Sequence, residues 1–189
     1  LVQRHADLGL AGAFPRNCRD AAPCASAYVQ RFDLADGRAY NVAARVEGRD
    51  ATLCDAYVVV GAHLDHLGRS PRDALDAERG EVLRPGADDN ASGTAAVLEL
   101  ARRLAARPPR RSVLLVHFDA EERGLIGSQV FVAEPPVAAA SLVVMLNLDM
   151  VGRLRGAPLQ LDASTATPAW RALADSAVRA TGLATTRAR

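Results

Sequence analysis

The sequence predicts an α/β domain built on a largely parallel β-sheet. Three apolar, β-branched runs, YVVV at 57–60, SVLLVHF at 112–118 and SLVVMLNL at 141–148, are separated by segments with helical periodicity. Strands that alternate with helices in this way form a parallel sheet with helices on its faces. The apolar run within residues 56–63 is continuous rather than alternating, which is typical of a strand buried on both faces. With 189 residues, of which 49% are hydrophobic, the chain is long enough for one domain with a sizeable core.

The N-terminal third is expected to contain the end of a helix and three strands. Residues 1–9 are typical of the last turns of a helix, and a turn-rich segment follows to about residue 25. Two short strands are predicted at 27–34 and 39–46, because the turn residues Ala35-Asp36-Gly37 lie between them. The apolar residues 56–63 predict a central strand.

A long helix is predicted over residues 91–106, which are rich in Ala, Leu and Arg and carry an apolar stripe. Asn90 or Ser92 can cap its start, and Pro108-Pro109 ends it. The polar residues 69–86 that precede it are expected to form a long loop. Because long ordered loops are often functional, we expect this loop, together with sequence beyond residue 189, to supply the walls of a substrate pocket.

Two more helices and one strand complete the expected order of elements. A short helix is predicted at 123–133, and a third core strand at 141–149. The final helix is expected over 167–181, with Thr167 as its N-cap and Pro168 in its first turn.

Charge and hydropathy exclude several kinds of partner. A formal net charge of +1, with scattered arginines, gives no reason to expect nucleic acid or an anionic membrane surface. No apolar stretch approaches the roughly 20 residues needed to cross a bilayer, so no membrane partner is expected. The oligomeric state stays open.

The cysteines and the first residues bear on the cellular compartment. Cys18 and Cys24 are six residues apart and can form a disulfide that would suit an exported protein, although their pairing stays open. Their spacing, with Cys54 alone, matches no thiolate zinc site. The N-terminal residues lack the apolar run of a signal peptide, and the chain starts without Met, which indicates processing or trimming. We expect a secreted or periplasmic protein.

Four short acid-rich segments indicate the chemistry: GAHLDHLG at 61–68, PGADDNASG at 85–93, FDAEERG at 118–124 and LNLDMVG at 146–152. Three of them lie where an apolar run ends, which is where α/β sheets bind their ligands. Taken singly, His63, the Asp88–Asn90 stretch and the Glu121-Glu122 pair each fit a purely structural role. An unpaired Asp149 inside an apolar run does not fit one, because its burial is costly. The four segments together therefore indicate a bound cation.

Nitrogen and oxygen ligands favour zinc as that cation. Asp65, two residues after His63, can orient the imidazole through its second ring nitrogen. The carboxylates suffice for two divalent ions, which can lower the pKa of a bridging water and polarise a carbonyl. One of the adjacent glutamates can then stay off the metal and act as general base.

These four motifs resemble those of the co-catalytic dizinc aminopeptidases, the family that includes secreted bacterial leucine-type aminopeptidases and glutamate carboxypeptidase II. The resemblance extends from about residue 39 to residue 152 and keeps the motif order of the family. It implies a three-layer α/β/α sandwich around a mixed, largely parallel sheet. It also implies a zinc metallopeptidase that removes N-terminal residues from peptide substrates.

The resemblance implies a role for each candidate residue. Four residues would bind zinc: His63 and Asp149 the first ion, Glu122 the second, and Asp89 both. Asp65 would support His63. Glu121 would act as general base, taking a proton from the bridging water that attacks the peptide carbonyl and passing it to the leaving amine.

One departure from the family pattern concerns a further histidine ligand, which the family places well downstream of the LNLD motif. The four histidines here are His5, His63, His66 and His117, so none follows Asp149. His66 is expected to be a supporting or surface residue, and His117 a packed core residue. We therefore expect residues 1–189 to be a single zinc-peptidase catalytic domain that lacks its C-terminal part and binds one or two zinc ions.

Two other functions fit the same motifs. Glutaminyl cyclases share the implied fold but use a single zinc for a cyclotransferase reaction. A non-catalytic binding domain is the second alternative, if 189 residues is the natural length. Such a domain would bind fewer than two zinc ions and hydrolyse no aminoacyl substrate.

Overall fold

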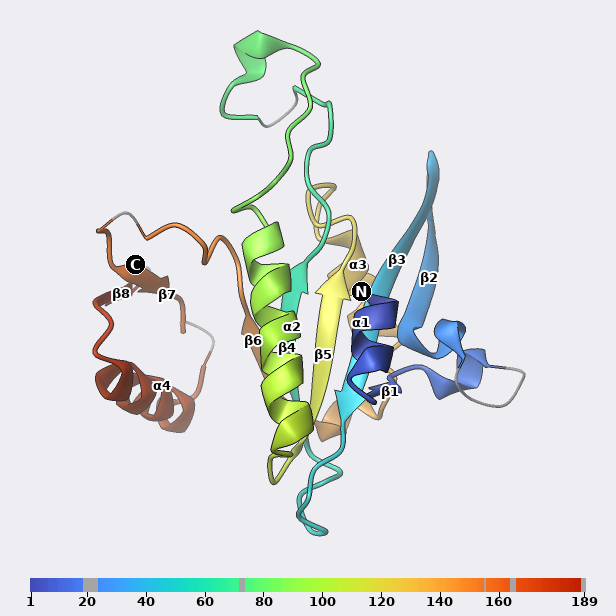
Figure 1. Cartoon of the computed structure of the whole chain (residues 1–189), viewed down its shortest axis with the longest axis vertical. Helices are drawn as coiled ribbons and strands as arrows, with labels where there is room; N and C mark the ends of the chain where they lie inside the picture. The colour runs from blue at the N-terminus through green and yellow to red at the C-terminus, as the bar shows by residue number, and fades with distance from the viewer. Residues whose placement is uncertain (19–23, 72–73, 155, 164–165, 188–189) are drawn as a thin grey trace. The chain divides into compact units, whose positions relative to one another are not determined.

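The computed structural model describes residues 1–18, 24–71, 74–154, 156–163 and 166–187. The chain forms two compact units, Leu1–Met150 and Val151–Arg189. The larger unit contains a six-stranded mixed sheet with helices packed against it (Figure 1). Its strands are β1 (Ala11–Gly12), β2 (Val29–Leu34), β3 (Gly37–Val46), β4 (Tyr57–His63), β5 (Ser112–Phe118) and β6 (Leu142–Asn147).

The strand order is β1-β3-β5-β4-β6, and β2 pairs with β3 as the second arm of a hairpin. β4 is parallel to both of its neighbours, β5 and β6. β3 is antiparallel to β5, so the sheet is mixed, as the resemblance implies. The parallel strands β5, β4 and β6 end at the same edge, because His63 pairs with Phe118 and Gly61 pairs with Asn147. The loops that follow these three strands therefore start side by side.

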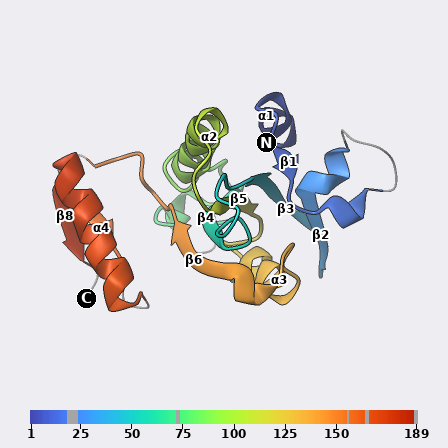
Figure 2. The same ribbon diagram turned by 90° about the horizontal axis from the view of Figure 1, so that it is seen from below.

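Helices cover both faces of this sheet, which gives the three-layer arrangement (Figure 2). α1 (Val2–Asp7) and α2 (Ala91–Ala106) pack on one face, and α3 (Ile126–Ala133) packs on the other. Short 3₁₀ turns occur at Pro15–Asn17, Ala25–Tyr28, Ala77–Arg79 and Ala139–Ser141. α2 has the predicted bounds, and Asn90 caps it by accepting a hydrogen bond from the Gly93 N–H.

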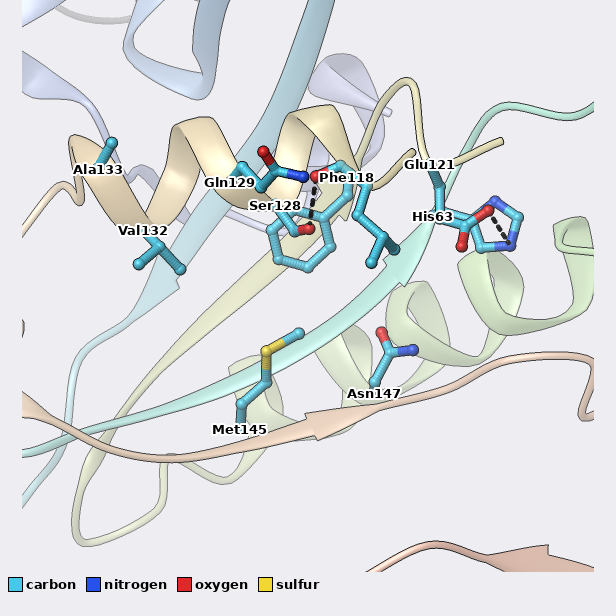
Figure 3. A pocket seen from close by; sticks show the side chains of 10 residues that line it. His63, Phe118, Glu121, Ser128, Gln129, Val132, Ala133, Met145 and Asn147 are labelled. Carbon is cyan, nitrogen blue, oxygen red and sulfur yellow. Dashed lines mark hydrogen bonds and ion pairs between the residues drawn. The ribbon is translucent and has the colours of Figure 1, made fainter. Parts of the chain in front are cut away.

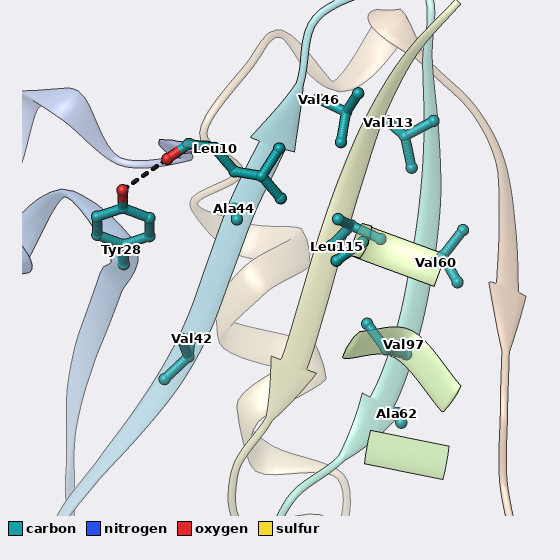
Figure 4. Close-up of a cluster of buried hydrophobic side chains, with 11 residues drawn as sticks. Leu10, Tyr28, Val42, Ala44, Val46, Val60, Ala62, Val97, Val113 and Leu115 are labelled. Carbon is teal, nitrogen blue, oxygen red and sulfur yellow. Dashed lines mark hydrogen bonds between the residues drawn. The ribbon is translucent and has the colours of Figure 1, made fainter. Parts of the chain in front are cut away.

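The core explains why β5 contains the continuous apolar run Val113–Val116. All seven of its residues are buried, since helices cover both of its faces. Val113 and Leu115 point into the cluster under α1 and α2, where they meet Val97 (Figure 4). Leu114 and Val116 point into the opposite cluster, beneath α3. Each such fully buried side chain contributes about 1.5–3 kcal/mol relative to an exposed one.

β6 differs from the prediction of a third core strand. It forms the end of the described strand order, and most of its side chains are exposed, including Val143, Met145 and Leu146. The apolar composition of residues 141–149 predicted the strand correctly but not its burial. Burial depends on the neighbours that a strand acquires in the sheet, which an apolar run does not reveal.

The predicted loop 69–86 is ordered around one arginine in its described part. Arg84 is buried, and its guanidinium donates hydrogen bonds to the Asp76 carboxylate and to the carbonyls of Ser70, Val82, Gly80 and Asp76. A β-bridge between Gly68 and Arg84 closes the base of the loop. Elsewhere, Cys18 and Cys24 form a disulfide, and Cys54 is a free, half-buried thiol.

The smaller unit consists of one helix and two short strands. α4 (Pro168–Thr181) follows the prediction, with the Thr167 hydroxyl accepting a hydrogen bond from the Trp170 N–H and Gly182 ending the helix. β7 (Leu159–Leu161) and β8 (Thr185–Arg187) pair in parallel. Three-residue strands are too short to produce a sequence pattern. None of the described helices, in either unit, is both long and apolar enough to cross a bilayer.

Candidate metal centre

The structure brings the six predicted site residues together at one edge of the sheet. His63 is the last residue of β4, and Asp65 follows it by two residues. Glu121 and Glu122 lie in the loop after β5, and Asp149 lies just after β6. Asp89 immediately precedes Asn90, the N-cap of α2. The cluster is therefore formed where three parallel strands end and one helix begins.

The first group of ligand atoms surrounds the buried imidazole of His63. Its Nε2 lies 3.1 Å from Asp89 Oδ1 and 3.5 Å from Asp149 Oδ1. The ligand atoms of these three residues all lie within 4.8 Å of one another. Glu121 is more distant, with its Oε2 4.0 Å from His63 Nε2. The predicted ligands of the first zinc therefore form one cluster, and Glu121 lies at the edge of this cluster.

A second group involves a histidine that the sequence did not place among the ligands. His66 Nδ1 lies 2.7 Å from Glu122 Oε1 and 3.7 Å from Asp89 Oδ2. The ligand atoms of His66, Asp89 and Glu122 also lie within 4.8 Å of one another. The sequence signal was the spacing of HLDH, which places His66 three residues after His63 on the same segment.

Asp65 fixes the loop that carries both glutamates. Its Oδ1 accepts a hydrogen bond from the Glu121 N–H at 3.0 Å, and its Oδ2 accepts one from the Glu122 N–H at 3.2 Å. The contact between Asp65 and His63 uses a different group of Asp65 than the sequence predicted. His63 Nδ1 lies 3.1 Å from the Asp65 backbone carbonyl and 3.6 Å from the carboxylate. Asp65 therefore supports the imidazole mainly through its main chain and uses its carboxylate to hold the β5 loop.

Asn90 connects the start of α2 to the segment that carries Asp149. Its Oδ1 accepts hydrogen bonds from the N–H groups of Gly93 and Met150, and its Nδ2 donates to the Leu148 carbonyl at 2.9 Å. The sequence predicted only the helix cap. Asp89 directly precedes Asn90, and Asp149 lies between Leu148 and Met150. These bonds therefore hold both aspartates next to the imidazole of His63.

The carboxylates and the burial of the site shift three pKa values. Burial lowers the pKa of His63, but the contact with Asp65 and the charges of Glu121 and Asp149 outweigh it and raise that pKa to about 9. Burial raises the pKa of Glu121, and Glu122 and Asp149 raise it further against the opposing charge of His63. Burial also raises the pKa of Asp65, but the neighbouring imidazole of His63 and the hydrogen bonds from the loop N–H groups hold it below its usual value. The pKa of the Glu121 carboxyl thus lies above its ordinary value, which is the direction that favours a general base.

The donor set fits zinc. Zinc bonds of about 2.0–2.1 Å in tetrahedral geometry separate ligand atoms by about 3.3 Å. The two distances from His63 Nε2, 3.1 Å to Asp89 and 3.5 Å to Asp149, bracket that separation. Imidazole nitrogen and carboxylate oxygen are ligands that zinc accepts.

An apolar cavity of about 590 Å³ adjoins the cluster (Figure 3). Its residues come from the ends of β4 and β5, from the loop before α3, from α3 and from β6; they are His63, Phe118, Glu121, Leu125, Ser128, Gln129, Val132, Ala133, Met145 and Asn147. None of these residues comes from the described part of the 69–86 loop. Glu121 faces both the cavity and the metal ligands, so a molecule in the cavity would meet this carboxylate.

The fold and the site together define an α/β protein with a centre for a divalent metal beside an apolar cavity. The sequence pattern of peptidase family M28 matches residues 41–188. The chain belongs to this family, as the resemblance predicted.

Relatives with curated descriptions agree with this membership. A probable zinc metalloprotease of Pyrenophora teres f. teres is 36% identical over 129 residues, which cover 60% of this chain and 26% of the relative. Leucine aminopeptidase 1 of Arthroderma otae is 36% identical over 124 residues, covering 62% of this chain and 30% of that protein. The chain thus spans between a quarter and a third of the length of these relatives.

Solved structures confirm the fold. A Zn-dependent exopeptidase from Parabacteroides distasonis superposes with a TM-score of 0.73 at 22% identity, covering 100% of this chain and 66% of that one. Tannerella forsythia glutaminyl cyclase superposes with a TM-score of 0.65 at 27% identity, covering 99% and 69%. The α/β class with a mixed sheet and flanking helices is confirmed.

Proposed function

We propose that this chain carries the zinc site of an aminopeptidase, which hydrolyses N-terminal residues from peptides. The observation that supports this most directly is the position of Glu121. Its carboxylate is 4.0 Å from His63 Nε2 and also lines the apolar cavity. A base in this position touches both the metal ligands and the space where a substrate would lie.

In this proposal four residues hold zinc, and the complete site holds two ions. They are His63, Asp89, Asp149 and Glu122. Bound zinc supplies a Lewis acid and lowers the pKa of water. Glu121 accepts the proton of the attacking water on its carboxylate and donates it to the nitrogen of the leaving amine. Asp65 holds Glu121 in place for both transfers through the loop N–H groups.

The cavity favours peptides that begin with an apolar residue. Phe118, Leu125, Val132 and Met145 present mostly hydrocarbon to its interior, and such a surface selects apolar side chains. The clustered carboxylates beside it would attract the positively charged amine of a peptide N-terminus. Together these features support an apolar aminoacyl group as the preferred substrate.

The decisive experiment compares Glu121→Gln with the wild type on a leucyl anilide substrate. We expect kcat to fall by about 10²–10⁴-fold, the usual contribution of a general base, with zinc content unchanged. Glu99→Gln on the exposed face of α2 is the matched control and should retain full activity. Loss of zinc from Glu121→Gln would instead identify Glu121 as a ligand and contradict the assignment.

Glutamine cyclisation is the second candidate, favoured by the structural likeness to the Tannerella forsythia glutaminyl cyclase at 27% identity. The two reactions are separated by one pair of assays: release of the leucyl group from an anilide, and cyclisation of an N-terminal glutamine. Turnover of the glutaminyl peptide without hydrolysis of the anilide would replace the peptidase proposal.

We also propose that the protein is exported, to the periplasm or the medium. The Cys18–Cys24 disulfide supports this, since disulfides persist mainly in oxidising compartments. Cell fractionation tests it. Recovery of the protein in the cytosol with both thiols reduced would contradict export.

A further inference from the structure

We propose that His66 is the nitrogen ligand of a second metal subsite, which it forms with Asp89 and Glu122. This inference rests on the proposed function, because it assigns the second ion of the same centre. The HLDH motif places His66 close to His63 in the chain but does not by itself assign it as a ligand. The assignment comes from where its ring lies in the structure.

The first observation is the orientation of Asp89. Its two carboxylate oxygens face different histidines: Oδ1 lies 3.1 Å from His63 Nε2, and Oδ2 lies 3.7 Å from His66 Nδ1. In the common bridging mode, a carboxylate directs one oxygen to each of two ions. Asp89 already has this arrangement, with an imidazole on each side.

The second observation is the spacing of the donor atoms. His66 Nδ1 lies 2.7 Å from Glu122 Oε1 and 3.7 Å from Asp89 Oδ2. These distances bracket the separation of about 3.3 Å between ligands of a tetrahedral zinc. Among the described residues, His66 is the imidazole that groups with Asp89 and Glu122 at metal-binding distance.

The third observation is that the ring of His66 is held in place. Gly86 has a φ of 62° and passes directly against it, so that a Cβ at position 86 would lie 2.7 Å from both Cβ and Cγ of His66. Only a residue without a side chain allows this approach. A surface histidine would need no such packing, whereas a ligand benefits from a fixed ring.

Zinc titration of the metal-free chain by calorimetry tests the proposal without using activity. We expect two bound ions in the wild type. In His66→Ala we expect one ion at unchanged affinity, with the second weakened by more than about 100-fold, because even supporting residues contribute 10–100-fold. Gly86→Ala keeps every donor but displaces the ring, and it should weaken the same second ion.

A matched control and a second measurement complete the design. His63→Ala should weaken the other ion, so the two histidine variants should affect different binding steps. Cadmium-113 NMR of the wild type with ¹⁵N-labelled histidine should show two cadmium signals, one of them coupled to His66, whether or not the variants fold. Two unaltered zinc sites in His66→Ala, or no coupling to His66, would overturn the proposal. If the wild type binds two ions through His66 but hydrolyses no aminoacyl substrate, the aminopeptidase proposal fails and this one stands.

Discussion

Asp65→Asn should uncouple the catalytic loop from the strand that carries His63. The Asp65 carboxylate accepts two backbone hydrogen bonds, 3.0 Å from the Glu121 nitrogen and 3.2 Å from the Glu122 nitrogen. Asparagine has one acceptor oxygen, and its amide group would face the other N–H. One bond to a charged acceptor, about 1.5–3 kcal/mol, is lost, and the other becomes an ordinary bond worth about 1 kcal/mol. We expect the free energy of unfolding to fall by about 3 kcal/mol.

Zinc binding and turnover should fall together with stability, because the loop carries the proposed general base Glu121 and the proposed zinc ligand Glu122. We expect zinc affinity or kcat to fall by about 10–100-fold, as for other residues that support a metal site. Urea unfolding in the presence of a chelator measures the stability loss without the contribution of metal binding. Zinc titration and the leucyl anilide assay then measure the functional loss.

Asp50→Asn is the control for this prediction. Asp50 also accepts hydrogen bonds from a backbone N–H and a hydroxyl, both from Thr52, and from Arg110, but it lies in a remote turn. Asp50→Asn should leave zinc affinity and turnover unchanged. If Asp65→Asn lost no stability and bound zinc as the wild type does, Asp65 would not be holding the loop.

Three further predictions follow from other parts of the molecule. Burial lowers the pKa of His5 to about 4, and burial together with the charge of His5 lowers that of His117 to about 3. Both values lie below the ordinary pKa of about 6.5, so the unfolded chain takes up protons first on acidification. The neutral histidines therefore leave the free energy of unfolding unaffected above pH 6.5, and it falls below that pH. Between pH 7 and pH 5 the free energy of unfolding should fall by about 4 kcal/mol, because each histidine contributes about 1.4 kcal/mol per pH unit below pH 6.5. Urea titrations should show no such loss in the His5→Leu/His117→Leu double variant. Gly93→Ala places a Cβ against the Leu148 carbonyl and the Asn90 amide, so thermal melting should report a loss of about 1–3 kcal/mol; an unchanged melting temperature would contradict this close packing. Val132→Phe narrows the apolar cavity and should lower kcat/KM for leucyl relative to alanyl anilide by about tenfold, whereas an unchanged ratio would place the substrate elsewhere.

The sequence predicted the parts of the site that depend on strand ends. Apolar runs marked β4, β5 and β6, and the acidic motifs after them had to meet once those strands became parallel neighbours. His66 and the cross-link formed by Asn90 could not be predicted in this way. Both depend on contacts between segments that are far apart in the chain, such as Asn90 and Leu148, whose positions differ by 58. The exposure of β6 was also beyond prediction, because it depends on which strands and helices become its neighbours.

The cluster combines two kinds of interaction that perform separate tasks. Hydrogen bonds to the backbone fix the loops: Asp65 holds the Glu121 loop, Asn90 holds the Asp149 segment, and the Thr94 hydroxyl donates to the His63 carbonyl at 3.0 Å. These bonds hold several carboxylates close together, which is unfavourable because like charges repel. The fold can hold this arrangement because the strands and α2 position the backbone through a core that does not involve the acids. A cation bound among these carboxylates would relieve their repulsion. Such positioned charge favours tight metal binding, and we therefore expect substitution of the supporting residues Asp65 and Asn90 to weaken it.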